Sequence, residues 1–168
     1  YSVAEILESA DAEDLISTGK HEIERILKIE PVVRGGGIWL ERYALSPDKS
    51  HAMTYLTIDS TGIIHNMQLK GSDYDYFKKE WYAAAIEKGK GKWSIPYFDE
   101  GAGESEMTTF SVPFTTTGGI SGVVTSDIFL NELLNDFDNL RPYPESVISR
   151  TYIDANTRLE AGYATAVK

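Results

Sequence analysis

The sequence has no cysteine among its 168 residues. Zinc fingers, iron–sulfur clusters and thiol nucleophiles are therefore excluded, because each of them requires cysteine side chains. The chain also lacks any run of about 18 apolar residues, so no segment of it is predicted to span a bilayer. A cysteine-free chain is compatible with an oxidising compartment but does not require one.

Basic residues are in the minority, with 16 Lys and Arg against 26 Asp and Glu and a formal net charge of −10. This balance argues against a nucleic-acid partner, whose phosphates need a basic face. It also argues against docking on an anionic membrane surface. Most acidic side chains are expected on the solvated surface, so the charge alone does not demand a cationic ligand.

Motifs for catalysis are missing as well. The histidines, His21, His51 and His65, fall in separate predicted elements without the spacing of metal ligands. The triple glycine at 35–37 lacks the Lys-Ser/Thr that completes a phosphate-binding loop, and no G-x-S-x-G elbow is present. No nucleophile pairs with a base, so we expect neither an enzyme nor a cofactor.

Four carboxylates gather near one predicted turn: Asp99, Glu100, Glu104 and Glu106. Paired carboxylates can perform acid–base chemistry, and clustered ones can hold a hard cation. A solvated hairpin loop is the simpler interpretation. Because the EF-hand frame is absent, no metal is predicted.

The spacing of apolar residues predicts the helices and strands in the first half of the chain. Residues 2–30 form a helix, which Gly19 should bend or divide into two. Residues 34–37 are expected to form a flexible turn. Three strands with one side facing a core should follow, at 38–43, 53–58 and 63–69.

A helix at 78–88, capped by Ser72 or Asp73, opens the second half. Three antiparallel strands should follow it, at 93–99, 107–114 and 122–128, and then a short helix at 131–140. The tail is predicted to hold two strands between 147 and 167. The pattern predicts an α+β domain, an antiparallel sheet flanked by helices, with a long N-terminal helix.

The segment 72–127 carries a family resemblance. A Trp-Tyr pair in a helix is followed by W-x-x-P-Y-x-D, T-T-x-S-V-P and G-V-V-x-x-D. Together these motifs resemble the extracytoplasmic Cache family of double-Cache type, the PAS-like sensor domains of bacterial transmembrane receptors. The resemblance implies a stalk-like helix at 1–30 and a PAS-like domain at 31–141. Residues 142–168 would then be a last hairpin or the start of a truncated membrane-proximal domain.

The resemblance also implies a ligand site. Amino-acid-binding members carry a Tyr, then Arg-x-Trp-Tyr, then two separate Asp residues, and the arginine position is a lysine here. The matching residues in this sequence are Tyr74, Lys79, Trp81, Tyr82, Asp99 and Asp127.

The chemistry of these residue types suits an α-amino acid. A cation and an indole N–H can hold its carboxylate, while two aspartates and a phenol oxygen can hold its ammonium. Lys79 offers a point charge rather than the planar fork of arginine, so an amine or an organic acid stays open as ligand. Trp81 and Tyr82 could instead pack a helix on the sheet, and Asp127 could cap the last helix. Trp39 and Trp93 are expected in the core.

We therefore expect an extracytoplasmic small-molecule sensor of a bacterial receptor: a histidine kinase, phosphatase, diguanylate cyclase or chemoreceptor. A chain that begins at Tyr1 without Met suggests an excised fragment or a processed chain. Flanking transmembrane helices would lie outside it, and a homodimer could form through the first helix. Two alternatives remain: a ligand-free structural or dimerisation module, and a small hydrolase using carboxylates around Asp99.

Overall fold

The structure, a computed structural model, describes residues 2–71, 73–131, 133, 147–148 and 163–164. The chain divides into two compact units, residues 1–130 and 131–168. In the second unit, β8 (Val147–Ile148) pairs antiparallel with β9 (Tyr163–Ala164). The helix predicted at 131–140 and most of the predicted tail hairpin lie outside the described residues.

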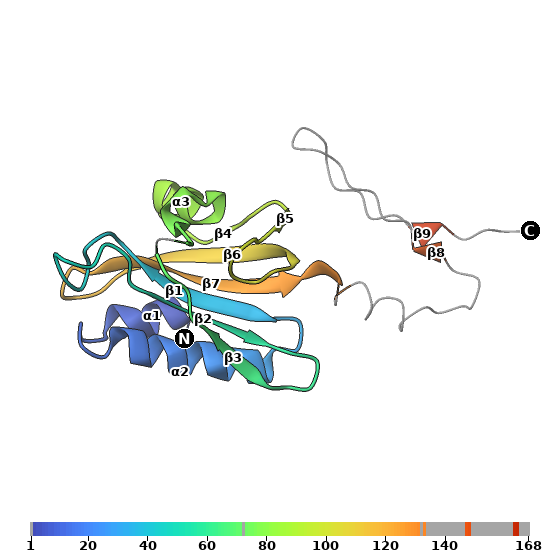
Figure 1. Ribbon diagram of the computed structural model, residues 1–168, viewed down its shortest axis with the longest axis horizontal. Coiled ribbons are helices and arrows are strands. Elements are labelled where there is room, and N and C mark those ends of the chain that lie inside the picture. The colour runs from blue at the N-terminus through green and yellow to red at the C-terminus, as the bar shows by residue number, and fades with distance from the viewer. Residues whose placement is uncertain (1, 72, 132, 134–146, 149–162, 165–168) are drawn as a thin grey trace, which may run out of the picture. The chain divides into compact units, whose positions relative to one another are not determined.

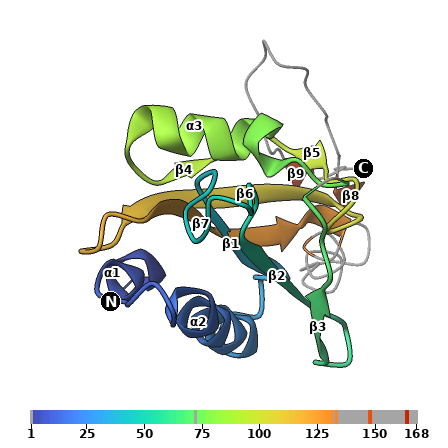
Figure 2. The ribbon, with the colours of Figure 1, turned by 60° about the vertical axis from the view of Figure 1, so that its left-hand side comes forward.

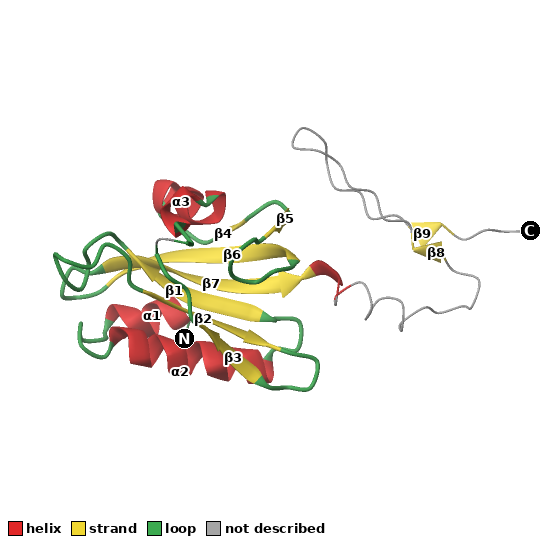
Figure 3. Ribbon diagram, in the orientation of Figure 1, coloured by secondary structure: helices red, strands yellow, loops and turns green. Residues whose placement is uncertain are grey.

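The first unit is built on a seven-stranded antiparallel sheet with helices on both faces (Figures 1 and 3). The strand order is β3-β2-β1-β7-β6-β4, and β5 also pairs with β6. This architecture confirms the predicted α+β, PAS-like fold. The strands are β1 (Gly35–Leu40), β2 (Met53–Ile58), β3 (Ile64–Met67), β4 (Lys92–Trp93), β5 (Tyr97–Phe98), β6 (Glu106–Thr115) and β7 (Ser121–Phe129).

One face of the sheet is covered by α1 (Val3–Glu8) and α2 (Leu15–Ile29), as Figure 2 shows. The predicted N-terminal helix is thus divided in two, but the break lies at residues 9–14 and not at Gly19. Gly19 is inside α2 and buried, where a Cβ atom would collide with the side chain of Ile38. The glycine therefore lets α2 approach the sheet closely, and this packing offsets its low helix propensity.

The two faces of the sheet bury different kinds of side chain. The α1–α2 face holds an aliphatic core made mainly of leucine, isoleucine and valine, which includes Leu7, Leu15, Ile23, Leu27, Ile38, Leu56 and Val124. The opposite face holds an aromatic core under the 3₁₀ helix η1 (Tyr76–Lys78) and helix α3 (Glu80–Lys88). Trp39 lies at its centre, as predicted for a core residue.

The rings around Trp39 form a continuous aromatic layer. Its ring centroid lies between 5.1 and 5.6 Å from those of Tyr55, Tyr74, Tyr76 and Trp81. Offset and tilted arrangements at such distances are favourable for aromatic pairs. This layer fixes the position of α3 over the sheet.

The triple glycine is not a flexible turn. All three glycines belong to β1, where they pair with β2 on one side and β7 on the other. The prediction was wrong because it used the intrinsic flexibility of glycine, which the two flanking strands override. Strand β2 coincides with its predicted range of 53–58, and β3 is shorter than predicted.

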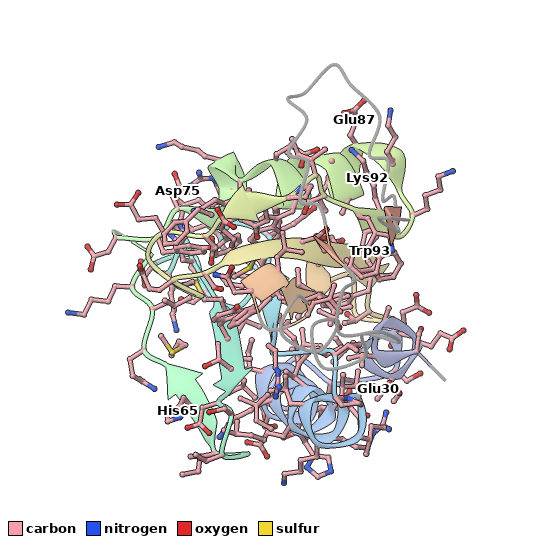
Figure 4. The ribbon with its side chains drawn as sticks, turned by 90° about the vertical axis from the view of Figure 1, so that its right-hand side faces the viewer. Glu30, His65, Asp75, Glu87, Lys92 and Trp93 are labelled. Carbon is pink, nitrogen blue, oxygen red and sulfur yellow. The ribbon has the colours of Figure 1, made fainter. Side chains whose placement is uncertain are left out.

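The segment 93–99 holds two short strands, β4 and β5, instead of one long strand. Trp93 lies on the edge strand β4 (Figure 4). Its ring packs at a tilt against that of Phe110 with centroids 5.1 Å apart, and the residue remains 49% exposed. Its predicted place in the core was wrong, because an edge strand is covered on one side only. Helix α3 begins at Glu80 with Lys79 as its N-cap, not with Ser72 or Asp73.

Candidate ligand-binding site

Two aspartates are buried on the aromatic side of the sheet. Asp99 follows β5 directly and is 2% exposed, while Asp127 lies within β7 and is 3% exposed. A buried carboxylate is costly unless it is hydrogen-bonded or paired with a cation. The partners of each aspartate therefore define what the site can bind.

Asp99 has three partners. The Tyr74 hydroxyl donates to Oδ1 at 2.7 Å, and the backbone N–H of Gly103 donates to Oδ2 at 2.9 Å. Lys79 Nζ approaches Oδ1 at a longer 3.4 Å. Burial and the neighbouring Asp99 charge raise the pKa of Tyr74 well above its usual value, so the phenol stays a hydrogen-bond donor.

Asp127 is held by a chain of hydroxyl groups from neighbouring strands. Thr109, directly opposite in the β6–β7 register, donates to Asp127 Oδ1 at 2.7 Å. Because the Thr109 hydrogen is used there, Tyr97 donates to Thr109 Oγ1 at 2.8 Å. Burial raises the pKa of Asp127 to about 6 against the pull of its hydrogen bonds, and the Asp99 charge adds to the rise.

Tyr55 of β2 joins the two aspartates. A Cβ atom on Gly35 would lie 2.5 Å from the Tyr55 hydroxyl oxygen and 2.9 Å from Asp127 Oδ2. A Cβ atom on Gly103 would lie 3.1 Å from the same hydroxyl and 3.5 Å from Asp99 Oδ2. Burial, and then the Asp127 charge, raise the pKa of Tyr55 well above its usual value. Gly35 thus provides room where two polar groups approach the backbone.

Two buried polar atoms on this side of the sheet make no hydrogen bond with the described residues: the hydroxyl of Ser111 and the indole Nε1 of Trp81. The Tyr55 hydroxyl interacts with Asp127. Buried polar groups in proteins nearly always have partners, so such orphans call for an explanation. Donors of this kind can bind acceptor atoms of a ligand.

An open pocket of about 540 Å³ lies next to Tyr74 and Lys79, and neither buried aspartate lines it. Its lining contains Tyr74 and Lys79, but Trp81, Tyr82, Asp99 and Asp127 are not part of it. Acidic residues dominate the lining, which comprises Asp73, Tyr74, Asp75, Lys79, Glu100, Gly101 and Glu104.

Of the predicted site residues, Tyr74, Lys79 and Asp99 contact one another, and Asp127 lies across Tyr55 from Asp99. Asp127 is inside β7 and accepts from Thr109. Trp81 belongs to the aromatic layer, 5.1 Å from Trp39.

Tyr82 lies apart from both aspartates. Its ring packs against those of Tyr76 and Phe77 at 5.3 and 5.5 Å. Burial raises the pKa of its hydroxyl, and Tyr76, Glu41 and Arg42 are the charged or titrating groups next to it. The structure therefore places Tyr82 in the packing of α3.

Sequence reasoning did not find Tyr55, Tyr97, Thr109 or Gly35. The alternation of β2 and β6 points Tyr55 and Thr109 inward, which is a visible signal. What a single sequence does not contain is the register that sets Thr109 opposite Asp127 and Gly35 beside it.

The acidic turn after β5 is divided by the fold. Asp99 turns inward, whereas Glu100 and Glu104 are exposed and Glu104 accepts from the backbone N–H of Gly101 at 2.6 Å. Among the described residues, no three His, Asp or Glu side chains gather as a metal site. Within the same residues, no helix combines the length and apolar character needed to cross a bilayer.

Residues 20–135 match the family described as methyl-accepting chemotaxis protein-like, first PDC sensor domain. The chain belongs to this family. The match confirms the sensor-domain family expected from the motifs in segment 72–127. The family is one of receptor sensor domains, not of catalytic domains.

Solved structures of similar fold are extracellular or ligand-binding domains of receptors. The extracellular domain of the putative histidine kinase soHK1S-Z6 is 29% identical with a TM-score of 0.66, over 83% of this chain and 52% of that one. Methyl-accepting Chemotaxis protein X is 23% identical with a TM-score of 0.66, over 85% and 57%. The ligand-binding domain of Pseudomonas aeruginosa PAO1 PctB, in complex with L-Arg, is 18% identical with a TM-score of 0.52, over 86% and 50%.

The chain spans about half the length of these structures. The two likenesses with the lower identities show a shared fold. No curated protein sequence matches the chain.

Proposed function

We propose that this domain is the extracytoplasmic sensing module of a bacterial receptor and binds a small organic ligand through an ammonium group. The observation that carries the proposal is the pair of buried aspartates, Asp99 and Asp127, on one face of the sheet. Asp99 contacts the cation Lys79, whose side chain lies at the edge of the site and is 28% exposed. Two carboxylates with one peripheral cation favour a ligand that brings positive charge.

An organic acid without an amine fits this arrangement poorly, because its carboxylate would face two aspartates. An amino acid fits better. Its ammonium would contact Asp99 beside the Tyr55 hydroxyl, with the charge of Asp127 behind that hydroxyl, and the unpaired Trp81 N–H is a donor for its carboxylate. The complexes of PctB with L-Arg and of the Campylobacter jejuni chemoreceptor Tlp3 with L-norvaline show that domains of this fold accommodate amino acids.

The signalling role follows from the family. A ligand that binds one arrangement of α3 and the sheet more tightly shifts the population toward that arrangement. Transmembrane helices and an output domain, either a histidine kinase or a chemoreceptor signalling region, would receive this bias. Dimerisation would use α1 and α2, which cover the face of the sheet opposite the site.

Isothermal titration calorimetry of the purified chain against amino acids, amines and organic acids tests the proposal. Asp127→Asn should weaken binding strongly, because it removes a buried negative charge close to the ammonium. Asp48→Asn removes a carboxylate from an exposed turn and serves as the matched control for net charge. The proposal fails if no compound binds, or if a ligand binds the Asp127→Asn variant as tightly as the parent chain.

One observation favours a second candidate, the ligand-free structural module. Four of the predicted site residues do not line the pocket, and Trp81 and Tyr82 belong to the aromatic core. In that case light scattering should report a dimer. Thermal melts should show that no compound of the panel changes its melting temperature.

A further inference from the structure

Lys79 and Tyr74 lie between the open pocket and the buried Asp99. Both residues line the pocket, and both contact Asp99 Oδ1, whereas Asp99 itself is not in the pocket lining. A molecule entering from the pocket therefore meets the Lys79 ammonium before it meets the carboxylate.

Of the three contacts that the Asp99 carboxylate makes, the one with Lys79 is the longest. Lys79 Nζ lies 3.4 Å from Asp99 Oδ1 and 3.4 Å from the carbonyl oxygen of Glu100. Tyr74 and Gly103 donate to the same carboxylate at 2.7 and 2.9 Å. Of the three partners, the lysine ammonium is the one held least tightly, because hydrogen bonds weaken as their length increases.

The position of Lys79 allows its ammonium to leave. The residue joins η1 to α3, so its backbone is fixed, while a flexible four-carbon chain carries the charge. Nζ lies 4.4 Å from the centroid of the Tyr74 ring, and the side chain is 28% exposed against 3% for Asp99. The ammonium can thus move into solvent, while the carboxylate cannot.

The charge of the pocket favours cations. Among the described residues that line it, Lys79 is the only cationic side chain, and Asp73, Asp75, Glu100 and Glu104 are acidic. Asp75 is paired with Lys78 at 3.0 Å. A concave surface dominated by one sign of charge raises the local concentration of ions of the opposite sign.

We propose that Lys79 is a resident cation of the Asp99 carboxylate and that the ammonium group of the ligand displaces it. This inference rests on the proposed function of the site. The exchange replaces one ammonium with another, so Asp99 is never left unpaired. The displaced Lys79 then lies at the pocket mouth, where it pairs with the carboxylate of an amino acid but gains no partner from a simple amine.

The inference predicts opposite roles for Lys79 with different ligands. Lys79→Met removes the competitor, so a simple amine should bind more tightly, roughly threefold to tenfold, in line with the worth of a partly exposed ion pair. For an amino acid the same substitution also removes a partner of the carboxylate, so its gain should be smaller than that of the matched amine.

Calorimetric titration with two matched ligand sets tests these roles. One set is L-leucine, 3-methylbutylamine and 4-methylpentanoate, and the other is L-alanine, ethylamine and propionate. Lys88→Met is the matched control, because it removes the same charge from the last residue of α3, whose side chain is 53% exposed and does not line the pocket. Lys79→Arg keeps a cation and should leave amine affinity unchanged or lower. Thermal melts confirm that each variant folds.

Each outcome separates the inference from the proposed function. Amines that bind Lys79→Met more tightly than the parent chain, with Lys88→Met unchanged, support the displacement. This holds even if amines bind only the Lys79→Met variant. If the parent chain binds a ligand and Lys79→Met does not tighten the amine, the inference is overturned while the proposed function stands. If no member of either set binds the parent chain or Lys79→Met, both are rejected.

Discussion

Asp127→Asn should stabilise the domain at neutral pH. Burial holds the pKa of Asp127 at about 6 in the folded chain, against the ordinary aspartate value of 3.8. The folded state therefore binds the proton more tightly than the unfolded state. The contribution of Asp127 to the free energy of unfolding is fully present below about pH 4 and is lost as the pH rises through 6. Asparagine has no charge to bury and can still accept the hydrogen bond from Thr109.

The size of the effect follows from the two pKa values. Their difference, 3.8 to about 6, corresponds at 1.36 kcal/mol per pH unit to about 3 kcal/mol of stability lost above pH 7. We expect Asp127→Asn to recover most of this free energy at pH 7.5 and almost none at pH 4.

Urea denaturation at pH 4 and pH 7.5 measures the difference between the parent chain and Asp127→Asn. Comparing the two proteins at each pH cancels the titration of the other carboxylates, and Asp48→Asn controls for net charge. A variant that is less stable than the parent chain at pH 7.5, or a difference that does not change with pH, would refute the reasoning. In that case the protein would already stabilise the ionised form of Asp127.

Further predictions concern the surroundings of the two aspartates. Gly35→Ala should destabilise the domain by about 1–3 kcal/mol in urea denaturation, because the new methyl group overlaps the Tyr55 hydroxyl. Tyr74→Phe removes the 2.7 Å hydrogen bond to buried Asp99 and should cost about 1–3 kcal/mol by the same measurement. Trp81→Phe deletes an N–H that has no partner among the described residues and leaves a space in the aromatic layer, so the domain should lose about 1–2 kcal/mol of stability, and calorimetry should show amino-acid affinity falling about tenfold.

Matched substitutions elsewhere in the chain serve as controls. Gly118→Ala places a methyl group no closer than 3.6 Å to its nearest neighbour, Thr116 Oγ1, and should be neutral. Tyr43→Phe and Trp93→Phe alter side chains that are 56% and 49% exposed. If these controls lose as much stability or affinity as the site variants, the site residues have no special role.

Much of the architecture could be read from local patterns. The alternation of apolar residues located β2 at residues 53–58, and apolar spacing located the helices that became α1 and α2. Such patterns report which side of an element is buried. They contain nothing about partners distant in sequence, so the place of residues 35–37 in the sheet was not predictable from them.

The candidate site shows the same division. The family resemblance implied Tyr74, Lys79 and Asp99 as site residues, and these three contact one another. It did not identify Tyr55 or Thr109, because their approach to Asp127 depends on the register of β1, β6 and β7. It also implied Tyr82 as a ligand contact, which stays a prediction, and the ring of Tyr82 packs against those of Tyr76 and Phe77.

The three glycines of β1 leave residues 35–37 of this central strand without side chains, so only backbone separates the two faces of the sheet there. Gly35 faces Tyr55 and Asp127 on one side, while a Cβ atom on Gly36 would lie 3.2 Å from Ile23 of α2 on the other. Between the two layers lies bare main chain, with no side chain to yield by changing rotamer. Because tightly packed interiors transmit strain, a small displacement of β1 near the aspartates should also displace α2.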